Sequence, residues 1–336
     1  MHSTLEANPE TFHFRNLHPQ VLIGTASDRY AGWIGQIYSK DRYEERITKR
    51  TKIIAGKNFI EEVLPVDSSK EYFEHFPVLE IDFTFRLLLD QDGQPSQNYQ
   101  VLENYHRHLK AGDRLILKVP QIITAQKIHR GDQYVENEAY LNPQIFTEQF
   151  YKPAAKLLGS NLTGFIFEQE YQRQKDRTPV NEMARALDRF FQAVPKDTRY
   201  HLELRTDLYL RDQVFEVLKK FGVGQVLSHW TWLPPLRKQL AKASGRFFNS
   251  GNECVIRLMT PLGMRYEDAY AKAYPFDRLI EGMLQPEMVR ETVEIVKTAI
   301  KKGVLVNLII NNRAGGNAPL IAQAIAENFW GRRSLK

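Results

Sequence analysis

The 336-residue sequence contains a single cysteine, Cys254, so no disulfide bond can form within the chain. It also has no run of about 18 apolar residues, the length that a membrane-spanning helix requires. Its first twenty residues carry polar and charged side chains where a secretory signal needs an apolar core. These absences argue against a disulfide-linked secreted domain and against a membrane partner, and they predict a cytoplasmic protein.

Several catalytic and cofactor motifs are also missing. The chain has no G-x-S-x-G element for a serine nucleophile, no Walker sequence and no H-E-x-x-H zinc motif. His106 and His108 are two residues apart on a predicted helix, so their side chains would lie on different faces. Gly222 and Gly224 have the first spacing of a dinucleotide fingerprint, but Leu227 stands in place of the third glycine. We therefore predict neither a metal site nor a cofactor.

Charged residues are plentiful but nearly balanced. The 46 lysines and arginines and the 40 aspartates and glutamates give a formal charge of +6. This excess favours an anionic ligand, but it is spread over segments of mixed sign, so nucleic acid is the less favoured partner. Because 43% of the residues are hydrophobic, the chain can also bury the core of a globular protein.

Apolar runs alternate with segments of helical spacing along most of the chain. Strands are predicted at 21–24, 78–85, 115–119, 162–167, 200–204, 224–227, 254–258 and 304–310, and helices near 68–75 and at 99–109, 143–158, 180–191, 212–221, 286–302 and 318–329. Eight strands that alternate with helices imply a parallel sheet, and a TIM (β/α)8 barrel leaves this sheet without an open edge. A doubly wound open sheet is the alternative.

The predicted barrel forms one domain over residues 20–330, with insertions after strand 1 and strand 3. Residues 1–19 are an irregular lead-in, and about 26–76 form an insertion-rich first connection between strand and helix. Residues 331–336 form a basic tail.

Side chains alternate along a strand, so each barrel strand directs one set of residues inward. In the second strand Leu79 belongs to the apolar set, whereas Glu80, Asp82 and Arg86 belong to the polar set. Two interpretations fit the inward polar residues: a satisfied ion-pair network, or a site at the carboxyl ends of the strands, where barrel enzymes place their chemistry. The other members of the set are Lys118, His201, Glu203, Arg205, Arg257, Asn307 and Asn311.

The eighth strand runs into a polar, glycine-rich loop, NNRAGGNAP at 311–319. Barrels often bind a phosphate between the loops after strands 7 and 8, and here Arg257 precedes Asn311, Asn312, Arg313 and Gly316. Glycines let backbone amides approach a ligand closely. The alternative interpretation is that these residues only make a tight turn before the last helix.

Six segments carry a family resemblance: IGTASDRYAGWIGQIY at 23–38, VLEIDFTFR at 78–86, LILKVPQIIT at 115–124, LTGFIFEQ at 162–169, LELR at 202–205 and LIINNRAGGNAPLIAQAI at 308–325. In this order they resemble the landmarks of the family called domain of unknown function 72, or YecE-like. The resemblance implies a TIM barrel in a family whose activity is not established. The chain departs from the family pattern at Asp28, where an aromatic residue is common, at Phe85 in place of tyrosine, and at Ala125 in place of histidine.

The functional hypothesis is a polar, anionic ligand, carrying a phosphate or carboxylate group, bound at the C-terminal mouth of the barrel. Glu203 and Asp82 are the catalytic candidates for acid/base hydrolysis. The alternative is a non-catalytic protein that binds nucleic acid or a protein partner through the basic stretch at 42–57. The predicted ligand-binding residues are Arg86, Lys118, Arg205, Arg257, Asn311, Asn312 and Gly316, with Trp33 and Tyr30 as a lid.

Overall fold

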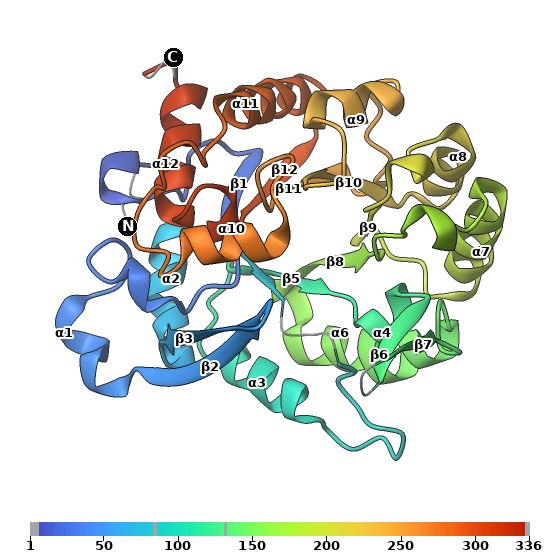
Figure 1. Ribbon diagram of the computed structural model, residues 1–336, viewed down its shortest axis with the longest axis horizontal. Helices are drawn as coiled ribbons and strands as arrows, with labels where there is room; N and C mark the ends of the chain where they lie inside the picture. Colours follow the sequence, from blue (N-terminus) through green and yellow to red (C-terminus); the bar gives the residue numbers. More distant parts are fainter. Residues whose placement is uncertain (1–6, 83–85, 131–132, 333–336) are drawn as a thin grey trace.

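Within residues 7–82, 86–130 and 133–332, which the computed structural model describes, eight parallel strands form a closed barrel (Figure 1). Their order around the barrel is β1-β12-β11-β10-β9-β8-β5-β4, and β4 pairs with β1. The strands are β1 (Val21–Ala26), β4 (Val78–Ile81), β5 (Arg114–Lys118), β8 (Leu162–Glu168), β9 (Tyr200–Glu203), β10 (Gly224–His229), β11 (Glu253–Leu258) and β12 (Leu305–Ile310).

The barrel confirms the predicted TIM fold, and each predicted strand corresponds to one of its strands. The second strand was predicted to extend to residue 85. The described strand ends at Ile81, and Phe83, Thr84 and Phe85 lie outside the described residues.

Helices connect the strands and cover the outside of the barrel (Figure 1). The predicted helices are present, although a π-helical segment, Thr147–Tyr151, divides the one at 143–158 into α5 and α6. No helix of the described segments is long and apolar enough to cross a membrane. The helices are α1 (Lys40–Tyr43), α2 (Ser69–His75), α3 (Gln97–His106), α4 (Gln121–Thr124), α5 (Pro143–Phe146), α6 (Lys152–Leu158), α7 (Val180–Ala193), α8 (Asp212–Phe221), α9 (Leu236–Lys242), α10 (Tyr266–Ala273), α11 (Pro286–Lys301) and α12 (Ala318–Phe329).

Both insertions contain a β-hairpin that the sequence analysis did not predict. The first hairpin pairs β2 (Thr48–Ile54) with β3 (Lys57–Val63), and the second pairs β6 (Lys127–Arg130) with β7 (Gln133–Glu136). In the first hairpin the strands are too rich in charge to show a core-facing pattern. Ala55 and Gly56 form its turn, with φ angles of 48° and 76°, a combination typical of tight hairpin turns.

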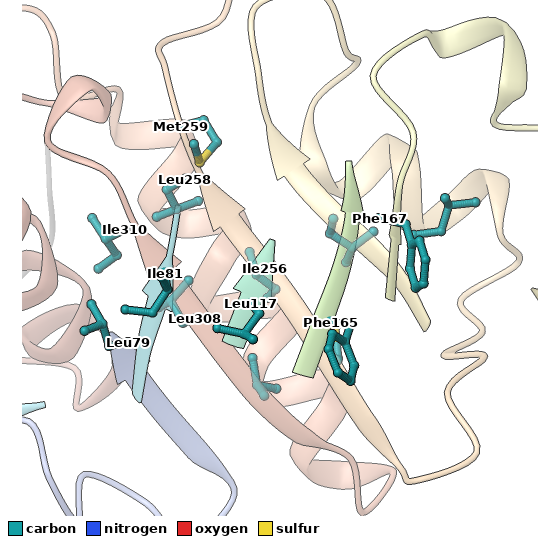
Figure 2. Packing of buried hydrophobic residues seen from close by; sticks show 14 of the residues in the cluster. Leu79, Ile81, Leu117, Phe165, Phe167, Ile256, Leu258, Met259, Leu308 and Ile310 are labelled. Atoms are coloured by element: carbon teal, nitrogen blue, oxygen red, sulfur yellow. The ribbon is translucent and has the colours of Figure 1, made fainter. Parts of the chain in front are cut away.

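Apolar side chains pack in two layers, one on each side of the barrel wall. The outer layer lies between strands and helices, and Figure 2 shows part of it: Leu79, Ile81, Leu117, Phe165, Phe167, Ile256, Leu258, Leu308 and Ile310. The inner layer fills the barrel below its mouth and consists of Leu22, Ala26, Val78, Ile116, Ile166, Val226, Val255 and Ile309. Because this inner layer closes the barrel, polar inward residues gather above it, at the carboxyl ends of the strands.

The seam between β1 and β4 closes the barrel, and it depends on a very close approach. A Cβ atom on Gly24 would lie 2.0 Å from the backbone oxygen of Val78 on the neighbouring strand. The Tyr72 hydroxyl, from α2, reinforces the seam because it donates to Val78 O at 2.8 Å and accepts from the Thr25 amide at 2.9 Å. Glycine is therefore required at position 24 by the neighbouring backbone.

We expect Gly24→Ala to destabilise the fold strongly, by about 3 kcal/mol or more, because the neighbouring strand would have to move. Gly164→Ala is a matched control: its Cβ would meet only the Ile116 side chain, at 3.1 Å, which can shift. Urea unfolding monitored by circular dichroism measures both free energies. Equal losses for the two variants would contradict the role of the β1–β4 seam.

Candidate functional site

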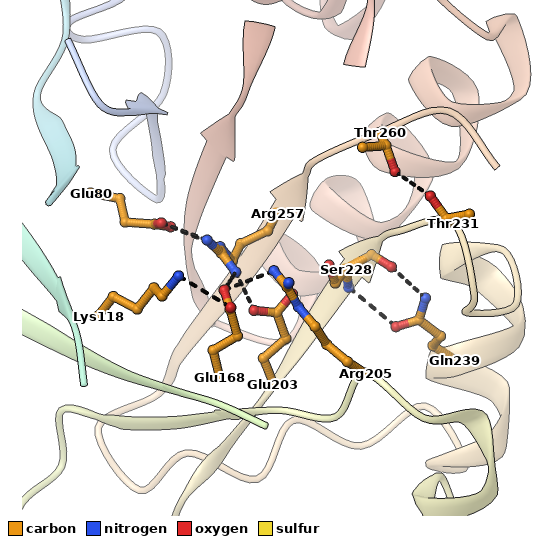
Figure 3. Close-up of polar contacts among 10 residues, drawn as sticks. All are labelled: Glu80, Lys118, Glu168, Glu203, Arg205, Ser228, Thr231, Gln239, Arg257 and Thr260. Carbon is orange, nitrogen blue, oxygen red and sulfur yellow. Dashed lines mark hydrogen bonds and ion pairs between the residues drawn. The ribbon is translucent and has the colours of Figure 1, made fainter. Parts of the chain in front are cut away.

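A network of buried ion pairs lies on the barrel axis above the inner apolar layer (Figure 3). At its centre is Arg257 on β11, which is 1% exposed. Its Nε and Nη2 atoms donate to the two carboxylate oxygens of Glu80 at 2.8 and 2.6 Å, and Nη1 donates to Glu168 at 2.9 Å and to Glu203. One guanidinium thus joins carboxylates from β4, β8 and β9.

Two further cations complete this group, which we call the axial network: Glu80, Lys118, Glu168, Glu203, Arg205 and Arg257. Glu168 lies 3.1 Å from Lys118 Nζ and accepts from Arg205 Nη2 at 2.7 Å. Arg205 also stacks on the Trp230 ring, with its guanidinium carbon 4.4 Å from the ring centroid. Three carboxylates therefore face three cations.

The charge balance determines the protonation state of the network. Burial alone would raise the pKa of Glu168, but Arg205, Lys118 and Arg257 outweigh it and hold that pKa well below its usual range. Burial would likewise lower the pKa of Arg257, but Glu203, Glu80 and Glu168 raise it well above the ordinary value. Glu168 and Arg257 are therefore charged and paired at neutral pH, as in the satisfied-network interpretation.

Beside the axial network lies a cavity of about 400 Å³, which we call the mouth cavity. It shares Glu80 with the network and opens between the barrel mouth, the β2–β3 hairpin and α10. Its wall comprises residues 27–32, Arg50, Lys52, residues 60–63 and 80–82, Tyr105, Tyr266, Tyr270, residues 274–276, Asn311 and Arg313.

The β2–β3 hairpin is fastened to α10, beside which it lies in Figure 1. Tyr270 of α10 donates to Glu61, and Lys52 lies 4.8 Å from the Tyr270 ring centroid while it pairs with Glu61 at 3.0 Å. Lys49 pairs with Glu62 across the hairpin at 3.4 Å. These contacts pair two of the cations in the basic stretch with carboxylates of the opposite strand.

Arg313 is the buried cation in the wall of the mouth cavity, whereas the other cations there, Arg29, Arg50 and Lys52, are partly or fully exposed. It lies in the short 3-10 turn Asn312–Ala314 after β12 and is 9% exposed. Its guanidinium carbon is 4.3 Å from the Tyr266 ring centroid, its Nε has no hydrogen-bond partner, and no described carboxylate forms an ion pair with it. Buried charges are normally paired, so this guanidinium is poised to accept an anion.

The predicted site residues divide between these two features. Lys118, Glu203, Arg205 and Arg257 belong to the axial network. Tyr30, Asp82 and Asn311 line the mouth cavity, and Asn311 Oδ1 accepts from the Arg313 amide at 3.0 Å. Arg86 is exposed and joins neither the network nor the cavity wall in the described structure.

The glycine-rich turn after β12 differs from the predicted anion site. Its amides donate within the protein: Gly316 to Asn312 O at 2.6 Å, and Ala318 to Asn312 Oδ1 at 2.8 Å. A Cβ atom on Gly316 would lie 2.3 Å from Arg278 O, so the glycine serves close packing. The turn therefore holds the last helix in place, which Asn317 caps through the Leu320 amide, and these contacts favour the tight-turn interpretation.

Trp33 differs from the predicted lid as well. It is fully buried, and its Nε1 donates to Asn312 Oδ1 at 3.2 Å, below the cavity wall. Tyr30 packs on it, with ring centroids 4.9 Å apart. Tyr30 belongs to the cavity wall and Trp33 supports it from the core, and a lid made of this pair would have to break the Trp33–Asn312 contact to move.

The histidines His201 and His229 are buried in the protein core. Burial lowers the pKa of both His201 and His229 to about 4, and the His229 Nδ1 atom is 2.8 Å from Thr260 O. Among the described residues, no three His, Cys, Asp or Glu side chains are placed to hold a metal ion.

Sequence reasoning did not commit to three residues that the structure brings into these features: Glu168, Arg313 and Asp28. In the sequence analysis Glu168 occurs only within the segment at 162–169, and Arg313 was placed only in the last loop. Asp28 was recorded as a departure from the family pattern. Nothing in the spacing indicates that Arg313 lacks a partner, because a missing partner is visible only once the fold is known.

Comparisons with known proteins identify the family. The profile of the family described as "Protein of unknown function DUF72" matches residues 57–334. The crystal structure of a DUF72 family protein from Thermotoga maritima aligns with a TM-score of 0.57 and 15% identity, over 93% of this chain and 99% of that chain. For a DUF72 family protein from Enterococcus faecalis the TM-score is 0.56 and the identity 15%, over 94% and 97% of the two chains. None of the curated proteins matches the sequence. Because the profile covers most of the sequence, this chain belongs to the DUF72 family.

Proposed function

We propose that this protein binds a small anionic ligand, bearing a phosphate or carboxylate group, in the mouth cavity. The observation that carries the proposal is Arg313, a guanidinium that is 9% exposed and has no counter-charge among the described residues. A buried unpaired cation costs free energy, and a ligand anion would offset that cost. Tyr266 holds the guanidinium in place by stacking on it, so the Arg313 side chain loses little conformational entropy when an anion binds.

The size and charge of the mouth support a small ligand over a polyanion. A volume of about 400 Å³ lies in the range of pockets for small molecules. The hairpin cations Lys49 and Lys52 already pair with Glu62 and Glu61, which leaves less free positive charge for nucleic acid. Most of the basic tail, residues 333–336, lies outside the described residues.

Asp82 is the carboxylate that we propose for hydrolysis. It lies at the end of β4 in the wall of the mouth cavity, where a ligand can reach it. Glu203, the other predicted catalyst, is fully buried between Arg257 and Arg205. We assign Glu203 to positioning these two arginines, and Asp82 to accepting a proton from the attacking water.

We expect Arg313→Gln to weaken the binding of inorganic sulfate by about tenfold or more, because a charge-assisted contact contributes about 1.5–3 kcal/mol. Equilibrium dialysis with labelled sulfate measures the dissociation constants. Arg107→Gln, at the exposed C-terminal cap of α3, is the control and should leave sulfate binding unchanged. Equal binding by wild type and Arg313→Gln, or no binding by wild type, would contradict the proposal.

Asp82→Asn and Glu203→Gln should separate chemistry from structure. With p-nitrophenyl phosphate as the probe, Asp82→Asn should slow turnover about 100-fold or more with an unchanged melting temperature. Glu203→Gln should lower the free energy of unfolding by about 3 kcal/mol, because it removes a carboxylate that compensates two buried arginines. Full turnover in Asp82→Asn would exclude it as the base, and no turnover in wild type would remove hydrolysis from the proposal.

A further inference from the structure

Asp28 is a second buried charge-bearing group of the mouth cavity that the axial network does not compensate. It follows β1, lines the cavity and is 2% exposed. Its backbone is held firmly, because its carbonyl oxygen accepts from the Tyr30 amide at 2.8 Å and from the Tyr38 hydroxyl at 3.0 Å. The carboxyl group therefore has a defined position in the wall.

The two carboxyl oxygens of Asp28 have different surroundings. Oδ1 accepts from the Tyr105 hydroxyl at 2.7 Å, whereas Oδ2 has no hydrogen-bond partner in the described structure. The adjacent Arg29 does not form an ion pair with Asp28; its Nη1 donates to Leu64 O at 3.3 Å. Glu80, on the neighbouring strand, shows the contrast, since Arg257 satisfies both of its oxygens.

This environment favours the neutral acid. Burial raises the pKa of Asp28, and the opposing effects of the Arg29 charge, the Tyr105 hydrogen bond and the backbone amides of Arg29 and Asp28 do not cancel the increase. Burial also raises the pKa of Tyr105 well above its ordinary value, so this tyrosine keeps its proton and donates it to Oδ1. The proton of the neutral carboxyl group then belongs on Oδ2, the oxygen without a partner.

We propose that Asp28 donates a hydrogen bond from Oδ2 to a neutral oxygen of the ligand whose anionic group binds Arg313. This inference rests on the proposed anion site and specifies its ligand: a small molecule that carries an acidic group and also a carbonyl, hydroxyl or ester oxygen. Both ends of such a ligand meet a group that the protein leaves uncompensated, one a cation and the other a proton donor.

The proposal makes anion binding depend on pH in a defined direction. As pH rises through the raised pKa of Asp28, the group loses its donor and places a negative charge in the cavity. Anion affinity should therefore fall with rising pH. Burial also raises the pKa of Glu80, against the effect of Arg257, so this residue could add to the dependence. The other titratable or charged groups facing Asp28 or its cavity are Arg29, Tyr30, Tyr38, Arg50, Lys52, Glu61, Glu62, Tyr72, Asp82, Tyr105, Tyr266, Tyr270, Tyr274 and Arg313.

The experiment measures sulfate binding by equilibrium dialysis from about pH 4 to about pH 9, a range in which sulfate remains a dianion. For wild type we expect the affinity to fall about tenfold over this range, as one unit charge near the anion would cause. Asp28→Asn keeps a neutral hydrogen-bond donor and cannot ionise, so it should bind at all pH values as wild type does at low pH. Any pH dependence of sulfate affinity that remains in Asp28→Asn is due to the other carboxylates of the cavity.

Tyr105→Phe provides an independent test that does not alter Asp28 itself. It removes the hydrogen bond that lowers the pKa of Asp28, so the midpoint of the wild-type pH dependence should move to higher pH. The same pH profile in wild type, Asp28→Asn and Tyr105→Phe would overturn this inference while leaving the Arg313 result intact. If Asp28→Asn does not fold, the Tyr105→Phe variant decides: a pH midpoint at the wild-type value would overturn the inference. Absence of sulfate binding by wild type would instead overturn the anion site.

Discussion

The Arg257 guanidinium is buried on the barrel axis, and much of the mouth is arranged to compensate its charge. A cation in this position is stable only when carboxylates surround it, and β4, β8 and β9 each supply one. Those carboxylates outnumber the cation, which explains why Lys118 and Arg205 are drawn in as well. The inner apolar layer beneath excludes water from one side, so the pairing must be complete within the protein.

Buried charges are paired on the barrel axis but not throughout the mouth cavity, and the functional interpretation rests on this difference. On the axis each described charge of the network has at least one opposite partner. In the adjoining cavity, Arg313 has an aromatic ring as its neighbour and Asp28 has a tyrosine hydroxyl. The network therefore gives the mouth its rigidity, whereas the cavity retains unsatisfied polar capacity that a ligand can use.

The barrel was predictable because its signal is local and repeated. Runs such as 162–167 and 304–310 are apolar enough to be recognised as buried strands. In other strands, the alternation of side chains predicted that Glu80, Glu203 and Arg257 point inward. The β2–β3 hairpin was not predicted because its strands lie outside the barrel and present charged residues to solvent. The turn at 315–317 kept two interpretations open because glycines that approach a ligand and glycines that approach another backbone look alike in sequence. The close approach of Arg278 O to Gly316 is visible only in the fold.

The mouth cavity takes its floor from the barrel but much of its outer wall from two connections, the β2–β3 hairpin and α10, which are more than 200 residues apart in the chain. Neither connection contributes a strand to the barrel. Evolution can therefore lengthen, shorten or recharge these loops without disturbing the axial ion pairs. A change in the length or charge of the hairpin or of α10 would thus reshape the outer wall of the mouth cavity while the barrel and its ion pairs stay the same.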